Sequence, residues 1–261
     1  MDYKDIASKV CDLCREVGAF IKLESDGFNK DSIEFKGIHD MVSYVDKGAE
    51  RRLIDGLSAI ILDSDFLAEE SGGSLNREGY TWIIDPLDGT TNFVHHIPFY
   101  SISIALLEDG KVVVGVVYEV MREECFYSYL GGAVFVDDKQ VRVSNETCLD
   151  RSLLATGFPY RDFTKLRRYS DTLYELMQET QGIRRCGSAA LDLAYVAAGR
   201  YEAFFEYALH PWDVAAGIFL VRQGGGQATT WDGNDDCISG AEIVAGNTKV
   251  CEAIINKISK H

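Results

Sequence analysis

Apolar residues recur at helical spacing in two segments near the start of the chain. The first set is Ile6, Val10, Leu13, Val17 and Ile21, and the second is Val45, Ala49, Leu53, Leu57 and Ile60. These spacings predict two amphipathic helices, one over about residues 3–23 and one opened by Ser43 and Asp46 in a loose capping-box arrangement. Residues 24–40 show no clear period, so we expect a loop or loose hairpin there that acts as a mobile flap.

The rest of the chain changes from strands to an alternation of strands and helices. Short strands are predicted at 66–68 and 80–84, followed by an antiparallel meander over 101–107, 111–118, 124–129 and 133–143. From about residue 150, strands at 153–156, 183–186 and 202–206 alternate with helices at 166–179, 189–198, 212–222 and 248–260. The pattern predicts an α/β protein built as a layered α+β sandwich. An N-terminal α+β lobe of residues 1–145 packs on an alternating α/β lobe of residues 146–261, as one compact unit.

Composition narrows the class of protein. The 261 residues are 46% hydrophobic and contain no apolar run of about eighteen residues, and the charged N-terminus does not resemble a signal peptide, so we expect a cytoplasmic protein. A formal charge of −15 argues against binding to nucleic acid or an anionic membrane. Seven cysteines predict free, mostly buried thiols, and Cys11 with Cys14 fits helix packing better than a metal or redox site.

The stretch W-I-I-D-P-L-D-G-T-T-N-F, residues 82–93, places two carboxylates on one short connection. Asp85 and Asp88 follow a predicted buried strand, and a proline and a glycine let the chain bend sharply after it. Gly89, Thr90 and Thr91 leave backbone N–H groups accessible to an anion. Carboxylate oxygens suit Mg²⁺, which also binds substrate phosphate. Taken alone, the D-P-L-D-G sequence is more often an ordinary turn with two solvated aspartates.

Four further segments have residues suited to the same acidic site. Glu69 ends a predicted strand beside a second glutamate, and Asp213 falls in the first turn of a helix that begins at Pro211, where the helix dipole favours the ionised form. The other two segments are Lys36 with Asp46, and G-S-A-A at 187–190, whose small residues at a helix start let a polar ligand approach. Each alone is also explained as a solvated turn, a helix cap or simple packing.

Together these segments resemble the inositol monophosphatase family, which consists of Mg²⁺-dependent, lithium-sensitive phosphatases. The resemblance runs nearly end to end and is carried by W-I-I-D-P-L-D-G-T-T-N-F-V-H at 82–95, E-E-S upstream of it, and W-D-V-A-A-G-I-F-L-V at 212–221. It implies a homodimer with two or three Mg²⁺ ions in each active site. Its implied reaction hydrolyses myo-inositol 1-phosphate to myo-inositol and phosphate by metal-activated water, without a covalent intermediate.

The resemblance also implies residue roles. Metal ligands would be Glu69, Asp85, the carbonyl of Leu87, Asp88 and Asp213, with Asp85 bridging two ions. Thr90, hydrogen-bonded to Asp46, would orient the attacking water together with Glu69. Phosphate would bind at Gly89, Thr90 and Thr91, and Lys36 matches a basic residue near the third ion. Contacts to the alcohol would come from Asp88, Gly187, Ser188, Ala189 and Glu206.

The sequence departs from the family pattern at two places, and it is compatible with several other functions. Ser43 stands where the family usually has threonine, and we expect His95 and His96 to be surface or interface residues rather than zinc ligands. Glu206 favours inositol phosphate, but the same chemistry also suits 3′-phosphoadenosine 5′-phosphate, fructose 1,6-bisphosphate or histidinol phosphate. A regulatory binding protein of this fold is the alternative from another class, because some family members are linked to RNA-processing machinery.

Overall fold

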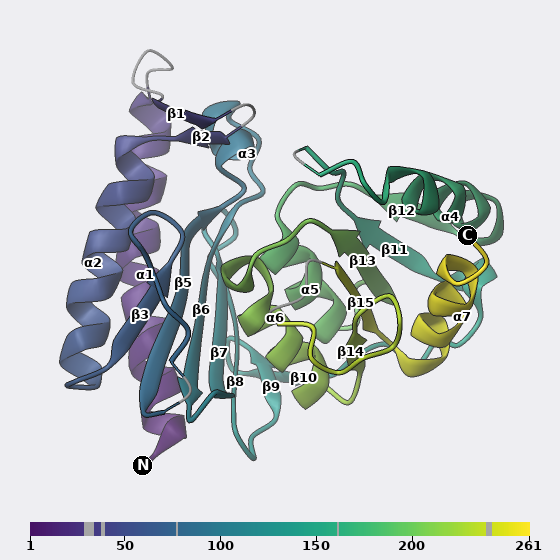
Figure 1. Cartoon of the computed structure of the whole chain (residues 1–261). Coiled ribbons are helices and arrows are strands. Elements are labelled where there is room, and N and C mark those ends of the chain that lie inside the picture. Colours follow the sequence, from purple (N-terminus) through teal and green to yellow (C-terminus); the bar gives the residue numbers. More distant parts are fainter. Residues whose placement is uncertain (29–33, 38–39, 77, 161, 239–241) are drawn as a thin grey trace.

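The chain folds into five alternating layers of helices and sheets. The computed structural model describes residues 1–28, 34–37, 40–76, 78–160, 162–238 and 242–261, and for residues 34–37 and 40–42 it describes only the backbone. Figure 1 shows α1 (Tyr3–Gly27) and α2 (Tyr44–Ile60) outside a first sheet, α5 (Ala189–Ala197) and α6 (Pro211–Gln223) between the two sheets, and α4 (Leu166–Glu179) with α7 (Thr248–Ile258) outside the second. The layered α+β sandwich is therefore confirmed.

The first sheet has eight strands in the order β10-β9-β8-β7-β6-β5-β3-β4. Their bounds are β3 Asp65–Ala68, β4 Gly72–Gly73, β5 Tyr80–Asp88, β6 Ser101–Glu108, β7 Lys111–Glu119, β8 Glu124–Tyr129, β9 Val134–Val136 and β10 Lys139–Val141. Strands β5 to β10 pair antiparallel, as the meander predicts, and the expected strand at 133–143 is a hairpin of two strands. A separate hairpin, β1 (Glu34–Gly37) with β2 (Asp40–Val42), lies in the segment predicted as a loop or loose hairpin.

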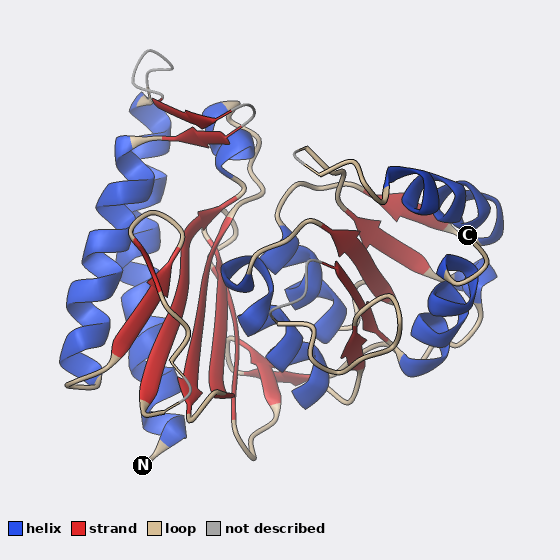
Figure 2. Ribbon diagram, in the orientation of Figure 1, coloured by secondary structure: helices blue, strands red, loops and turns tan. Residues whose placement is uncertain are grey.

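The second sheet has five strands in the order β12-β11-β13-β15-β14. Their bounds are β11 Leu153–Thr156, β12 Gly182–Arg184, β13 Ala203–Tyr207, β14 Gln227–Thr229 and β15 Glu242–Gly246. The first three run parallel, whereas β14 and β15 are antiparallel additions that the sequence pattern did not reveal. Short connecting elements are α3 (Thr90–Val94) and the 3₁₀ helix η2 (Leu149–Arg151). Figure 2 shows the two red sheets separated by the blue helices of the middle layer.

The middle helices are apolar on most of their surface because both sheets cover them. All residues of α5 from Ala190 to Ala197 and of α6 from Val214 to Val221 are buried. One core cluster joins side chains of both sheets through these helices, including Phe126, Leu193, Phe204 and Ile218. Gly217 permits the close approach of α6 to α5, because a Cβ there would lie 2.5 Å from the Cβ of Leu193. The division of the chain at residue 145 stays a prediction.

The structure also shows the state of the cysteines and the character of the helices. All seven cysteines are free, and only Cys148 is exposed, so the prediction of mostly buried thiols is confirmed. Among the described residues, no helix combines the length and apolar character needed to cross a membrane.

Candidate active site

A cavity of about 210 Å³ lies where the ends of several elements meet. Its walls come from the end of β5, the start of α3, the N-terminal ends of α5 and α6, the end of β13, and the segment after β11. Figure 1 shows α3 beside the first sheet and α5 and α6 between the sheets, so the cavity draws residues from both halves of the chain. Of the site residues predicted from the sequence, Glu69, Asp88, Gly89, Thr90, Thr91, Gly187, Ser188, Ala189, Glu206 and Asp213 line it.

The segment with Asp85 and Asp88 is not the simple turn that the proline and glycine predicted. Strand β5 continues to Asp88, and its pairing with β6 shifts register between Asp85 and Asp88. The irregularity leaves the Leu87 N–H free of the ladder to donate to Asp85 Oδ1 at 2.9 Å. The sharp bend comes one residue later at Gly89, whose φ of 100° places it in the left-handed region. The chain then enters α3, a short helix that was not predicted.

Asp85 is a buried carboxylate surrounded by other acids. It is buried, and burial raises its pKa well above the ordinary value of a carboxyl group. The negative charges of Glu69, Asp88 and Asp213 raise that pKa further. These four carboxylates therefore share one region of space, and a positive charge placed among them would relieve both burial and repulsion.

Asp88 connects the first sheet to the middle layer. Burial raises the pKa of Asp88 to about 6, against the opposing effect of hydrogen bonds from α5. Ser188 Oγ donates to Asp88 Oδ2 at 2.6 Å, and the Ala190 N–H donates to the same oxygen at 2.7 Å. The N-terminal end of α5 thus fixes one oxygen of Asp88, as the free N–H groups and dipole of a helix start allow.

Thr90 is held by two acceptors at the start of α3. Its Oγ1 lies 3.0 Å from Asp46 Oδ1 and 3.1 Å from the Leu87 carbonyl oxygen. Asp46 is itself fixed in the capping box of α2, where its Oδ2 accepts from the Ser43 N–H at 2.9 Å and from Ser43 Oγ at 2.6 Å. Burial raises the pKa of Asp46, and these hydrogen bonds oppose the shift. The predicted capping box and the contact between Thr90 and Asp46 are both present.

Asp213 occupies the first turn of α6 and also caps it. Its Oδ2 accepts from the His210 N–H at 2.7 Å in a capping box, so the cap role considered from the sequence is real. The same carboxylate lines the cavity and raises the pKa of Asp85. Across the described part of the chain, no three Asp, Glu, His or Cys side chains form a closed set of metal ligands. The donors gathered around Asp85 are carboxylate oxygens, which are the ligands that a hard cation such as Mg²⁺ prefers.

Glu206 also lines the cavity, near the end of β13. Burial raises its pKa to about 8, and the positive charge of Arg185 acts in the opposite direction. Its carboxylate packs against Gly157, where a Cβ would lie 2.0 Å from Oε1. The negative charges of Asp213 and Asp88 also raise the pKa of Glu206, so this acid lies within electrostatic reach of both.

Asn92, Asp192 and Arg185 are among the cavity residues that were not predicted from the sequence. The Asn92 amide donates to the Phe99 carbonyl at 2.7 Å and to the Cys186 carbonyl at 2.8 Å, which ties α3 to the start of the α5 segment. Asp192 is a buried carboxylate within the apolar helix α5, and a single charged residue in an apolar run could have identified it from the sequence. Nothing in the sequence around Arg185 distinguishes it in this way.

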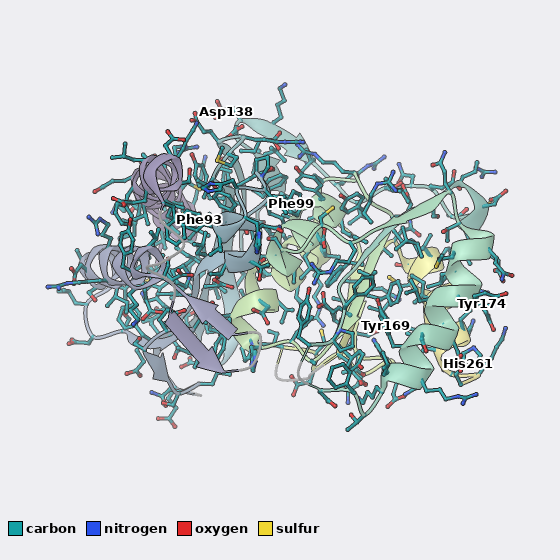
Figure 3. The ribbon with its side chains drawn as sticks, turned by 90° about the horizontal axis from the view of Figure 1, so that it is seen from above. Phe93, Phe99, Asp138, Tyr169, Tyr174 and His261 are labelled. Carbon is teal, nitrogen blue, oxygen red and sulfur yellow. The ribbon has the colours of Figure 1, made fainter. Side chains whose placement is uncertain are left out.

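The segment after α3 bridges the two halves of the molecule. Phe93 packs edge-on against Tyr100, whereas Phe99 packs edge-on against Tyr195 of α5. Figure 3 shows the corresponding arrangement, with Phe93 among the first helices and Phe99 nearer the middle layer. The site is therefore anchored to both cores.

Lys36, the histidine pair and the cysteine pair were also singled out from the sequence. The backbone of Lys36 belongs to β1, but its side chain lies outside the described residues. His95 and His96 are exposed at the end of α3, as expected for surface residues. Cys11 and Cys14 are buried on α1, far along the chain from every cavity residue.

The chain is similar to known proteins over nearly its whole length. A model of the inositol monophosphatase family matches residues 2–261. A Nus factor SuhB of Pseudomonas aeruginosa is 39% identical over 252 residues, covering 95% of this chain and 93% of the relative. An inositol-1-monophosphatase of Mesorhizobium japonicum is 39% identical over 229 residues, covering 87% and 86%. The crystal structure of the extragenic suppressor protein suhB from Bartonella henselae superposes with a TM-score of 0.92 at 37% identity, covering 98% of this chain and 99% of that one.

Proposed function

Because this chain belongs to the inositol monophosphatase family, we propose that it hydrolyses inositol monophosphate, a phosphate monoester, in a Mg²⁺-dependent reaction. Family membership supports a metal-dependent phosphatase. Inositol monophosphate as the substrate and Mg²⁺ as the ion are proposed in addition. The observation that carries it is the buried Asp85 carboxylate beneath a cavity whose wall includes Glu69, Asp88 and Asp213.

The acidic side of the cavity would hold the ions. The proposed ligands are Glu69, Asp85, the Leu87 carbonyl, Asp88 and Asp213. Two or three Mg²⁺ ions held there would supply the positive charge that activates water and stabilises the leaving alkoxide. Local hydrogen bonds already hold three of the carboxylates in place, namely Asp85, Asp88 and Asp213.

Thr90 is the proposed water-orienting group. Because its hydroxyl proton is directed to Asp46 or Leu87, its remaining lone pairs are free to accept a hydrogen bond from water in the cavity. Glu69 lines the same cavity and would assist. The N–H groups at Gly89, Thr90 and Thr91 would bind the phosphate oxygens, and Lys36 is proposed as a nearby basic residue.

The part of the cavity lined by Glu206 and the start of α5 would bind the alcohol. Gly187, Ser188 and Ala189 leave it open, and Glu206 offers oxygen acceptors to neighbouring ring hydroxyls. Polyols need several such acceptors, which favours inositol phosphate over the other esters considered.

The decisive experiment is phosphate release from a panel of esters with Mg²⁺ and after chelation. The panel contains myo-inositol 1-phosphate, 3′-phosphoadenosine 5′-phosphate, fructose 1,6-bisphosphate and histidinol phosphate. We expect the inositol ester to have the highest kcat/KM, Mg²⁺ to restore chelated enzyme, Li⁺ to inhibit, and light scattering to give a dimer mass. If the inositol ester is the poorest substrate, the proposed specificity is wrong. Activity that survives complete chelation contradicts the metal mechanism.

A pair of variants tests the site itself. Asp88→Asn removes a proposed ligand charge and should abolish turnover, whereas Asp12→Asn alters a carboxylate whose side chain is 75% exposed on α1 and should not. Equal activity of both variants would contradict the assignment.

A regulatory role is the second candidate, because the Pseudomonas aeruginosa relative is named a Nus factor. The Asp88→Asn variant separates the two functions in a strain that lacks this protein. Full rescue by the inactive variant would support a regulatory role, and failure to rescue would support catalysis.

A further inference from the structure

Arg185 brings a positive charge to a cavity dominated by acids. It is the single Lys or Arg among the described residues that line the cavity, which also includes five carboxylates. The Arg185 charge lowers the pKa of Asp88, Asp192 and Glu206, against the larger effect of burial in each case. Those three acids come from β5, α5 and β13, so one guanidinium lies within electrostatic reach of three separate elements.

Aromatic side chains hold Arg185 from the solvent side. Its guanidinium carbon lies 5.5 Å from the centroid of the Phe158 ring and 5.2 Å from that of Tyr160, and Nη2 donates to the Tyr160 hydroxyl. A Cβ at Gly187 would lie 2.7 Å from Arg185 Nη1. The guanidinium is therefore held between the two aromatic rings and Gly187, which has no side chain to displace it.

Two polar atoms around this position have unused hydrogen-bonding capacity. Within the described part of the chain, Arg185 Nε and Asp192 Oδ1 are buried without a hydrogen-bond partner. Buried donors and acceptors are normally paired, and an unpaired one marks a place where a water molecule or a ligand adds the missing bond. Both residues line the same cavity, so the unpaired donor and acceptor match a ligand rich in hydroxyl groups, either directly or through a bridging water.

We propose that Arg185 is a specificity-determining residue that holds Asp192 and Glu206 as acceptors for an alcohol with neighbouring ring hydroxyls. Without its charge, the two acids repel each other and Asp88, and their oxygens lose the arrangement that a polyol needs. The inference rests on the proposed phosphatase function and extends it to the origin of selectivity.

The test compares two substrates in three variants. myo-Inositol 1-phosphate offers ring hydroxyls, and p-nitrophenyl phosphate has the same reacting group without them. Arg185→Gln should lower kcat/KM for the inositol ester by roughly 10- to 100-fold, as expected for lost hydrogen bonds to charged groups, mainly through KM. Its kcat/KM for p-nitrophenyl phosphate should stay within about twofold of wild type. Arg185→Lys keeps the charge and should recover part of the selectivity.

Arg184→Gln is the matched control, because Arg184 is exposed and its Nη1 donates only locally to the Ile183 carbonyl at 3.3 Å. It should leave both substrates unaffected, and thermal unfolding should show that all variants are folded. Selectivity for the polyol that survives in Arg185→Gln overturns this inference and leaves the proposed function intact. Equal losses on both substrates also overturn it, because they indicate a general structural effect. A wild-type enzyme without polyol selectivity overturns both proposals.

Discussion

Gly157→Ala is the substitution whose effect can be worked out most directly from the structure. Gly157 follows β11, and a Cβ at this position would lie 2.0 Å from Glu206 Oε1 and 2.2 Å from both Cδ and Oε2. Ordinary contact begins at 3.4 Å, so the carboxylate must retreat by about 3.4 − 2.0 = 1.4 Å. The clash is with the end of a side chain and not with backbone. Glu206 therefore moves while the fold remains.

The magnitude follows from what such a displacement does to substrate positioning. A shift of about 1 Å in a positioning group costs on the order of 100-fold in rate. We expect kcat/KM for inositol phosphate to fall by about 100-fold, chiefly through KM, with a much smaller loss on p-nitrophenyl phosphate. The free energy of unfolding should change by less than about 2 kcal/mol, because alanine also lowers the entropy of the unfolded chain by about 0.4–1 kcal/mol.

Steady-state kinetics on both esters, with thermal unfolding of each protein, measures these effects. Gly27→Ala is the matched control, since a Cβ at Gly27 meets no atom within 4 Å. A Gly157→Ala enzyme with wild-type selectivity for inositol phosphate would refute the assignment of Glu206 to the alcohol. A large loss on both esters would instead show that Gly157 supports the whole site.

Three other substitutions test the site, the packing and the surface charge. Thr90→Ala should lower kcat by roughly 100-fold or more while Thr90→Ser retains most of it, as stopped-time phosphate assays will show. Gly217→Ala forces a Cβ to 2.5 Å from that of Leu193 and should cost about 1–3 kcal/mol of unfolding free energy in denaturant titrations. The hydrogen-bonded Arg200 guanidinium lowers the pKa of Glu124 below 4.5, so this pair stabilises the fold above that pH and the contribution disappears as the pH falls through the lowered pKa. Glu124→Gln should therefore be less stable than wild type at pH 7, with the difference shrinking below about pH 4.5; a constant difference down to pH 3 would contradict the assignment.

The elements that the sequence predicts well are those whose signal is local. The capping box of Ser43 and Asp46 fixes the start of α2 over three residues, and α4 has the predicted bounds because its apolar positions are cleanly periodic. Strands β14 and β15 were not predicted because they are short and mostly buried. A buried strand of three to five residues lacks the alternation that reveals a half-exposed one.

At the end of β5, the sequence motif was identified correctly but its local structure was predicted wrongly. Proline and glycine predict a turn, but tertiary pairing with β6 carries the strand through Pro86 to Asp88 with a register shift. The bend moves to Gly89, and α3 follows because Asn92 binds carbonyl groups of two other segments. Those partners are 7 and 94 residues away in the chain, so no local pattern reveals them.

Site residues held by near neighbours in the chain could be predicted from the sequence, whereas the contacts of those held by distant partners could not. Asp85 accepts from an N–H two residues away, and Asp213 from one three residues away, so their orientation is encoded within the motifs themselves. Asp88 depends on partners 100 and 102 residues away, and Thr90 on Asp46, 44 residues away. Asp85 and Asp213 are therefore held by their own neighbours even though their charges repel. This repulsion is an electrostatic cost of the fold, and the proposed Mg²⁺ ions would offset it, so the same charges that destabilise the acidic cluster would provide the affinity for the ion.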